Sequence, residues 1–300
     1  MDKIAVLIPC YNEALTIRKV VEDAKRALPE AAIYVYDNNS TDDTVKEATE
    51  AGAIIRYEKK QGKGNVVRAM FEQIDAECYI IVDADDTYGL EAAPLLADSV
   101  LKDGADMAIG DRLSGAYFTE NKRAFHGVGN KVVRSGIRLF FHQKISDVMT
   151  GFRAFSRRYV KSFLVESNGF EIETEMTIYA IENDLKITSY TIEYRDRPEG
   201  SSSKLNTVKD GIKVLRLIHR SHYRYHPLRA FGEAALCLLA LDSIPIAFAA
   251  VLWGSTGGYV SFGVAVFAFL VVLCLLGIGI HKNKKAKRSK AEQKAKIESL

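Results

Sequence analysis

Short apolar runs alternate with amphipathic stretches through residues 1–203 of the chain. A run such as residues 4–8 has the length and composition of a buried strand, whereas residues 13–28 repeat apolar side chains at helical spacing. The pattern predicts strands at residues 4–8, 32–36, 53–57, 78–82 and 107–109, and helices at residues 13–28, 41–51 and 64–74. Strands separated by helices indicate an α/β domain whose doubly wound, mostly parallel sheet has helices on both faces.

Two long apolar stretches, residues 231–253 and 259–280, follow this domain. Each has about the 20 residues that a helix needs to cross a bilayer. The second stretch has no charged residue, while the first contains Glu233, Asp242 and Pro245. A glycine-rich turn separates them, so we expect a hairpin of two transmembrane helices. The alternative is a pair of buried core helices in a soluble protein.

Two further stretches combine apolar and basic residues at helical spacing. Residues 208–229 place Ile212 and Leu215 among lysines and arginines, which predicts a basic amphipathic helix on the bilayer surface. A solvated surface helix is the alternative. Residues 125–141 have a similar pattern and form either a second interfacial helix or a helix packed on the sheet.

The charge of the chain is unevenly distributed. The sequence has 300 residues, of which 48% are hydrophobic and 26% charged, and these values exclude a disordered chain. The net charge of +3 divides into −7 for residues 1–203, +6 for 204–229, −2 for 230–281 and +6 for 282–300. An acidic domain next to two basic blocks argues against a nucleic-acid binder and favours a membrane surface.

These patterns predict the domain organisation and the location of the chain. We expect a cytoplasmic domain at residues 1–205, amphipathic helices at 206–230, two transmembrane helices at 231–281 and a basic cytoplasmic tail at 282–300. The positive-inside rule places the first domain and the tail in the cytoplasm. The four cysteines fit no zinc motif and no disulfide framework, so a reduced compartment is expected, and no signal peptide is visible.

Polar residues follow three of the predicted strands, at positions 9–13, 37–42 and 83–87. The carboxyl ends of parallel strands lie at one edge of a sheet, where ligands bind. Asp83 and Asp85 offer hard oxygen ligands that suit Mg²⁺ or Mn²⁺ together with substrate phosphates. Surface loops and turns also use such residues. Gly62-Lys63-Gly64 is either a phosphate contact or a plain turn, and dinucleotide and P-loop fingerprints are absent from the sequence.

The polar segments resemble, in order and spacing, the successive motifs of inverting family-two glycosyltransferases with the GT-A fold. The segments concerned are residues 9–13, 37–42, 62–64, 83–85 and 110–112. Residues 147–153 and 197–205 further resemble the polyprenyl-phosphate hexose synthases, of the dolichyl-phosphate mannose synthase type. The resemblance covers residues 3–280 and implies a GT-A domain followed by interfacial helices and the transmembrane hairpin.

The resemblance also implies roles for individual residues. Asp37 would hold the base or ribose, Asp83 the ribose or sugar, and Asp85 the Mg²⁺ or Mn²⁺ on the diphosphate. Nucleotide-sugar binding is implied for Pro9, Tyr11, Asn12, Glu13, Asp37, Asn39, Lys63, Asp83, Ala84, Asp85, Arg197 and Lys204, and catalysis for Asp83, Asp147, Arg112 and Arg123. Of these, Arg112 and Arg123 would meet the lipid phosphate. The family often has a polar ligand two residues after Asp85, where this chain has Thr87, and Glu173 is a further candidate near the donor.

The implied activity is transfer of a hexose from a nucleotide sugar to polyprenyl (undecaprenyl) phosphate, which gives a lipid-linked sugar donor for cell-envelope glycans. UDP-glucose or UDP-N-acetylglucosamine is favoured as donor, and GDP-mannose is the alternative. A processive polysaccharide synthase would need a Gln-x-x-Arg-Trp motif, which the sequence lacks. A non-catalytic, membrane-anchored nucleotide-sugar binder would not need Asp85, Arg112 and Lys204 together. Expected partners are the nucleotide sugar, the lipid, the membrane and, through the glycines of the second apolar stretch, a homo-oligomer.

Overall fold

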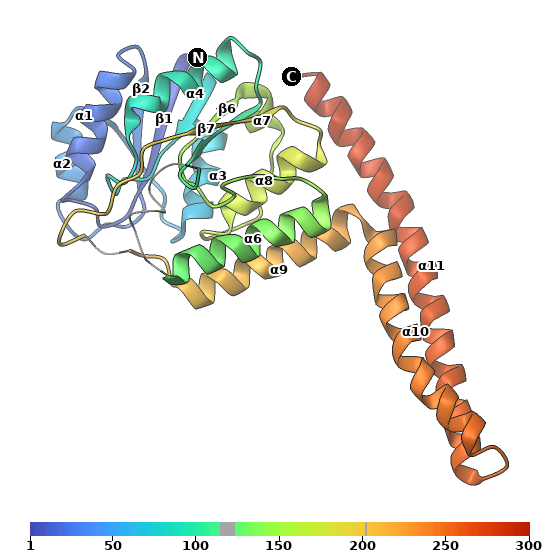
Figure 1. The fold of residues 1–300 in the computed structure, drawn as a ribbon. Helices are drawn as coiled ribbons and strands as arrows, with labels where there is room; N and C mark the ends of the chain where they lie inside the picture. Colours follow the sequence, from blue (N-terminus) through green and yellow to red (C-terminus); the bar gives the residue numbers. More distant parts are fainter. Residues whose placement is uncertain (115–123, 202) are drawn as a thin grey trace. The chain divides into compact units, whose positions relative to one another are not determined.

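The computed structural model describes residues 1–114, 124–201 and 203–300, and the side chains of residues 124–128 also lie outside the description (Figure 1). The chain divides into two compact units. The first is Met1–Ile218 together with Ala295–Leu300, and the second is His219–Lys294.

The first unit is built on a mixed sheet whose seven described strands have the order β3-β2-β1-β4-β6-β5-β7. The strands are β1 (Asp2–Cys10), β2 (Ala32–Asp37), β3 (Ile54–Tyr57), β4 (Ala76–Ile81), β5 (Met107–Asp111), β6 (Arg153–Ser156) and β7 (Ile187–Thr191). β1 to β4 pair in parallel, as do β5 and β7, whereas β6 runs antiparallel between β4 and β5. The sheet is therefore mostly parallel, which confirms the predicted fold class.

Helices pack on both faces of this sheet (Figure 1). One face carries α1 (Ile17–Ala27), α2 (Thr44–Glu50), the 3-10 turn η1 (Leu90–Ala92) and α4 (Ala93–Leu101). The other face carries α3 (Lys63–Gln73), α7 (Arg157–Ser162) and α8 (Ile172–Glu182). Of the two remaining helices of this part of the chain, α6 (Ala124–Phe141) contacts α8, and α9 (Thr207–Tyr225) follows β7 in the sequence. Successive residues of β1 enter opposite cores: Val6 packs with α1 and α4, and Leu7 packs with α3, α7 and α8. Burial on both faces explains why β1 reads as a continuous apolar run.

Some element boundaries differ from the prediction. The helix predicted at residues 13–28 begins at Ile17, because the N–H groups of Thr16 and Ile17 close a turn on the carbonyl of Glu13. The helix predicted at 41–51 begins at Thr44, whose N–H donates to Asp42 Oδ1. The amphipathic segment predicted at 208–229 ends as α9 at Tyr225, because Pro227 starts the next helix.

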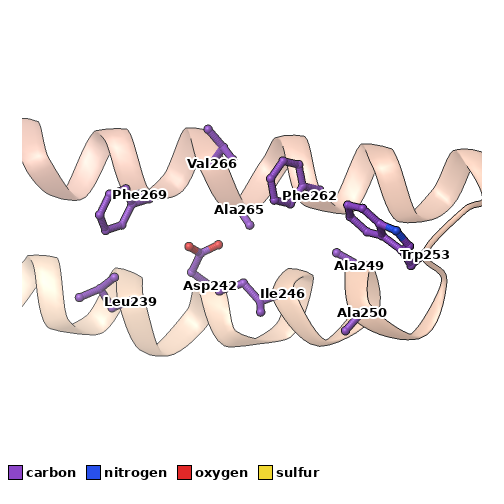
Figure 2. A pocket seen from close by; sticks show the side chains of 10 residues that line it. All are labelled: Leu239, Asp242, Ile246, Ala249, Ala250, Trp253, Phe262, Ala265, Val266 and Phe269. Carbon is purple, nitrogen blue, oxygen red and sulfur yellow. The ribbon is translucent and has the colours of Figure 1, made fainter.

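The second unit contains α10 (Pro227–Val251) and most of α11 (Thr256–Glu298). Both helices are long and apolar enough to cross a membrane. They face each other across a cavity lined by apolar side chains, among which Asp242 points from α10 toward α11 (Figure 2). Trp253 and Tyr259 pack at the turn that joins the helices, with ring centroids 5.8 Å apart.

Candidate active site

The loops that follow β1 and β2 hydrogen-bond to each other. Asn12 accepts the N–H of Thr41 at 2.8 Å through Oδ1, and its own N–H donates to Ser40 Oγ at 2.9 Å. Asp37, the last residue of β2, accepts the N–H of Ser40 at 3.2 Å. Asn12 and Asp37, which the sequence placed at one edge of the sheet, therefore lie in a shared network.

The other residues predicted around the nucleotide occupy different environments along this edge. Pro9 lies within β1 opposite Tyr36, whereas Tyr11 is exposed just beyond the strand. Ala84 is buried between the two aspartates that follow β4. Asn39 has a left-handed backbone (φ 67°), and its amide donates to the carbonyl of Lys59 at 2.9 Å, so its side chain holds the loop after β3.

Asp85 is buried and pairs with an arginine from a segment far along the chain. Arg197 Nη2 lies 2.5 Å from Asp85 Oδ2, and Arg197 Nη1 lies 3.3 Å from Glu13 Oε1. Lys204 Nζ lies 3.6 Å from the same Glu13 oxygen. Burial raises the pKa of both carboxyls, and Asp83 raises that of Asp85 further. Arg197 opposes the shift of both pKa values, and Lys204 opposes that of Glu13. The segment carrying Arg197 and Lys204 thus supplies positive charge to the carboxylates of Glu13 and Asp85.

Thr87 supports Asp85 from the other side. Its hydroxyl donates to Asp85 Oδ1 at 2.6 Å, and its N–H donates to the same oxygen at 3.2 Å. Because the Thr87 side chain is buried and engaged in this bond, it orients the Asp85 carboxylate.

Lys63, at the start of α3, is held between two carboxylates. Its Nζ lies 2.5 Å from Asp83 Oδ1 and 2.6 Å from Glu173 Oε1, and only 9% of its side chain is exposed. Burial acts to lower the pKa of Lys63, but Asp83 and Glu173 outweigh it and raise the pKa. The ammonium group is therefore charged at neutral pH and fixes the orientation of Asp83.

The glycines on either side of Lys63 allow a close approach of two backbones. A Cβ on Gly64 would lie 2.3 Å from the carbonyl oxygen of Ser167, and one on Gly62 would lie 2.2 Å from that of Asn168. The N–H of Gly64 donates to the same Asn168 carbonyl at 3.1 Å. The Gly-Lys-Gly motif thus places the start of α3 against the loop before α8.

Arg112 and Asp147 form a bidentate pair after β5. Arg112 Nε lies 2.7 Å from Asp147 Oδ2, and Nη2 lies 2.9 Å from Oδ1. Asp147 is fully buried, and the guanidinium also lies 5.2 Å from the centre of the Tyr194 ring. Paired, planar contacts of this kind hold arginine in a defined orientation.

Arg153 holds the turn that carries Asp147. It is fully buried, and its guanidinium donates to the carbonyls of Val148 at 2.6 Å and Thr150 at 3.0 Å and to Thr177 Oγ1 at 2.8 Å. Burial lowers the pKa of Arg153. The turn at residues 147–150 is thereby attached to α8.

The carboxylates after β4 suit a divalent cation. Among residues 1–114, 124–201 and 203–300, no group of three or more His, Cys, Asp and Glu side chains is arranged to hold a metal. Asp85 nevertheless presents an oxygen that already attracts a cation, the Arg197 guanidinium, and Asp83 adds a second negative charge nearby. These hard donors fit an Mg²⁺ or Mn²⁺ ion that takes its remaining ligands from a substrate diphosphate.

The structure brings most of the predicted site residues to one edge of the sheet. Arg123 lies outside the described residues, so its predicted role stays a prediction. Sequence reasoning did not assign Arg153, Gly151 or Thr177 a role of its own. The Thr-Gly-Phe-Arg run at residues 150–153 was the signal for the first two, because it begins three residues after Asp147.

Comparison with known proteins assigns the family. The model of glycosyl transferase family 2 matches residues 5–164. The chain belongs to this family. It is 33% identical over 244 residues to glycosyltransferase AglJ of Haloferax volcanii, a match that covers 80% of this chain and 78% of that protein. It is 28% identical to the dolichyl-phosphate hexose transferase of the same organism, over 71% of this chain and 91% of that protein. The predicted enzyme class, a hexosyltransferase, is thereby confirmed.

Solved structures support the fold. The glucosyl-3-phosphoglycerate synthase of Mycobacterium tuberculosis, in complex with Mn²⁺, UDP and phosphoglyceric acid, matches with a TM-score of 0.58. That match is 18% identical in sequence and covers 74% of this chain and 78% of that one. The likeness confirms the predicted GT-A fold.

Proposed function

We propose that this enzyme transfers a hexose from a nucleotide sugar to polyprenyl phosphate, such as undecaprenyl phosphate, at the cytoplasmic face of a membrane. The observation that carries the proposal is the acidic pair Asp83 and Asp85, set among cationic groups of Lys63 and Arg197. The similarity to the dolichyl-phosphate hexose transferase supports a polyprenyl phosphate acceptor. UDP-glucose or UDP-N-acetylglucosamine is our favoured donor, and GDP-mannose is the alternative.

The donor would bind along the carboxyl ends of β1, β2 and β4. Asn12 and Asp37 would contact the nucleoside, and Asp83 would contact the ribose or sugar. Asp85 would hold the divalent cation, which when bound offsets the charge that develops on the leaving diphosphate. Arg197 and Lys204 now pair with Asp85 and Glu13, and they would turn to the donor phosphates, which carry more negative charge than a single carboxylate.

The acceptor would bind beside Arg112. A phosphate monoester is already anionic near neutral pH, so its oxygen can attack the anomeric carbon with little help from a general base. Attack opposite to the leaving diphosphate inverts the configuration, so an α-linked donor would give a β-linked product. Arg112 would orient the acceptor phosphate, and Asp147 would hold the guanidinium in place through its two bonds.

The proposed membrane contact rests on α9 and the hairpin. Val208, Ile212 and Leu215 of α9 are exposed at helical spacing, and basic residues flank them. We propose that this face lies on the bilayer, that α10 and α11 cross it, and that residues 1–205 face the cytoplasm. In this arrangement the sugar would be transferred at the membrane surface, where the lipid phosphate lies.

The test is transfer of label by the purified full-length protein in detergent with undecaprenyl phosphate and Mn²⁺ or Mg²⁺. Labelled UDP-glucose, UDP-N-acetylglucosamine and GDP-mannose are supplied separately. We expect label in the organic-extractable lipid from one donor, lost in Asp85→Ala and kept in Asp98→Ala, a matched control at an exposed position of α4. Nucleotide-sugar binding without a lipid product from any donor would favour the non-catalytic binder or another acceptor.

A further inference from the structure

The first turn of α8 carries a buried carboxylate that none of the proposed steps uses. Glu173 is 5% exposed, and its Oε1 lies 2.6 Å from Lys63 Nζ. The same ammonium group lies 2.5 Å from Asp83 Oδ1. Glu173, Lys63 and Asp83 therefore form a chain of charges that leads from the buried start of α8 to the acidic pair after β4.

Asp83 is the exposed end of this chain. Its side chain is 27% exposed, whereas those of Lys63 and Glu173 are 9% and 6% exposed. On its other side Asp83 meets the backbone of Gly151, where an added Cβ would lie 2.3 Å from Oδ2. One oxygen of Asp83 thus pairs with Lys63, and the other lies against the backbone of Gly151, so a shift of Lys63 would leave the carboxylate held from one side alone.

Lys63 in turn depends on Glu173. A lysine side chain is flexible and its ammonium group is a point charge, so one carboxylate partner does not define its direction. Two carboxylates, those of Asp83 and Glu173, together define the direction of the Lys63 side chain. Glu173 is itself well fixed, because Thr177 one turn later donates to its carbonyl at 3.0 Å, and the loop before α8 packs on Gly62 and Gly64.

We propose that Glu173 is a positioning residue for the donor nucleotide sugar, acting through Lys63 to orient the Asp83 carboxylate. The inference rests on the proposed function for the identity of the donor. It assigns Lys63 to the support of Asp83, in place of a direct contact with a phosphate. Removing Glu173 leaves Lys63 paired with Asp83. It also takes a negative charge from near the buried Arg153 guanidinium, which keeps its hydrogen bonds to Val148, Thr150 and Thr177, so we expect the Glu173→Ala protein to fold.

The test compares Glu173→Ala, Glu173→Gln and Glu182→Ala in the full-length protein. Glu182 is an equally buried carboxylate at the other end of α8, so Glu182→Ala is the matched control for a purely structural loss. The readouts are kcat, the KM for each substrate, and the affinity for UDP-glucose with Mn²⁺ by calorimetry. Glu173→Gln keeps an oxygen that accepts from Lys63.

We expect Glu173→Ala to raise the donor KM and lower kcat, each on the order of tenfold, with the acceptor KM within about twofold. Glu173→Gln is expected to recover most of the loss, and Glu182→Ala is expected to leave both KM values unchanged. Equal effects of Glu173→Ala and Glu182→Ala, or an unchanged donor KM in Glu173→Ala, would overturn the inference.

The calorimetric measurement of donor binding distinguishes a failure of this inference from a failure of the proposed reaction. Should the wild-type protein bind UDP-glucose and Mn²⁺ but make no lipid product, the proposed acceptor is wrong. The inference would then stand if Glu173→Ala alone weakened donor binding about tenfold. If donor binding were equal in Glu173→Ala and wild type, the inference would fail whatever the acceptor.

Discussion

The position of the Asp83 carboxylate depends on the absence of a side chain at Gly151. We predict that Gly151→Ala lowers activity by at least about tenfold, because the new methyl group displaces the movable end of Asp83 and a small misplacement at a reacting site is costly. The unfolding midpoint should fall as well, since the displaced Asp83 carboxylate is a partner of the buried Lys63. Transfer assays and thermal unfolding of the same preparations check both parts.

At Gly64 an added side chain would clash with backbone atoms, and not with a side chain as at Gly151. An alanine methyl group there would meet the backbone of Ser167, which cannot swing aside as a side chain can. We predict that Gly64→Ala destabilises the fold by about 1–3 kcal/mol, the usual cost of overpacking. Denaturant unfolding measures it. A stability equal to that of the wild type would contradict the described approach of the two backbones.

The acidic pair should make the reaction depend on a divalent cation. We expect a chelator to abolish sugar transfer and added Mn²⁺ or Mg²⁺ to restore it. Asp85→Asn should raise the concentration of metal needed for half-maximal activity by about 10–100-fold, because it removes a negative charge but keeps the shape. A metal titration of wild type and variant checks this. Full activity in the presence of chelator would contradict the proposal that Asp85 holds a divalent cation.

The sequence could identify these carboxylates but not their partners. Asp83 and Asp85 follow an apolar strand, and this local signal is sufficient to place them at the edge of a sheet. The reason for the glycines beside Lys63 lies about a hundred positions later, at Ser167 and Asn168, and no local pattern reveals it. The same holds for Glu173, whose distance from Lys63 is set by the packing of α8.

At the scale of elements, α8 supports both halves of the site. Glu173 pairs with Lys63, which in turn pairs with Asp83. One turn later in α8, Thr177 accepts a hydrogen bond from Arg153, which holds the turn that carries Asp147. We predict that Thr177→Val destabilises the protein by about 1–3 kcal/mol, because it leaves a buried donor of Arg153 without its acceptor. Chemical denaturation gives this value. Thr191→Val, at an exposed position of β7, is a control of similar shape.

α9 carries the prediction that concerns the bilayer. Replacing Ile212 and Leu215 by aspartate would place charge on the face proposed to lie on the lipid. We expect about tenfold or greater loss of transfer to polyprenyl phosphate in vesicles, since each apolar side chain contributes roughly 1.5–3 kcal/mol when fully buried. Binding of UDP with Mn²⁺ should not change. An unaltered rate in vesicles would argue that this face points to water.

At the scale of the whole molecule, the predictable parts are those with a local signature. The apolar stretches at residues 231–253 and 259–280 predicted two long apolar helices. α10 covers residues 231–251 of the first stretch, and α11 covers all of the second. The parallel strands β1 to β4 were predicted from apolar runs. β6 was not predicted, because four residues that begin with an arginine do not look like a central strand. Its place comes from partners on β4 and β5.

The position of β6 also sets the order in which the domain can be completed. β4 and β5 leave the ribosome well before Arg153–Ser156, yet that later strand lies between them. Until β6 has been synthesised, the edges of β4 and β5 that pair with it have unpaired backbone groups, and such strand edges promote aggregation. β6 therefore joins the two parts of the sheet, and β7 is added later at its edge. A fragment that ends before Arg153 would be expected to need a chaperone, even with all the loops after β1, β2 and β4 in place.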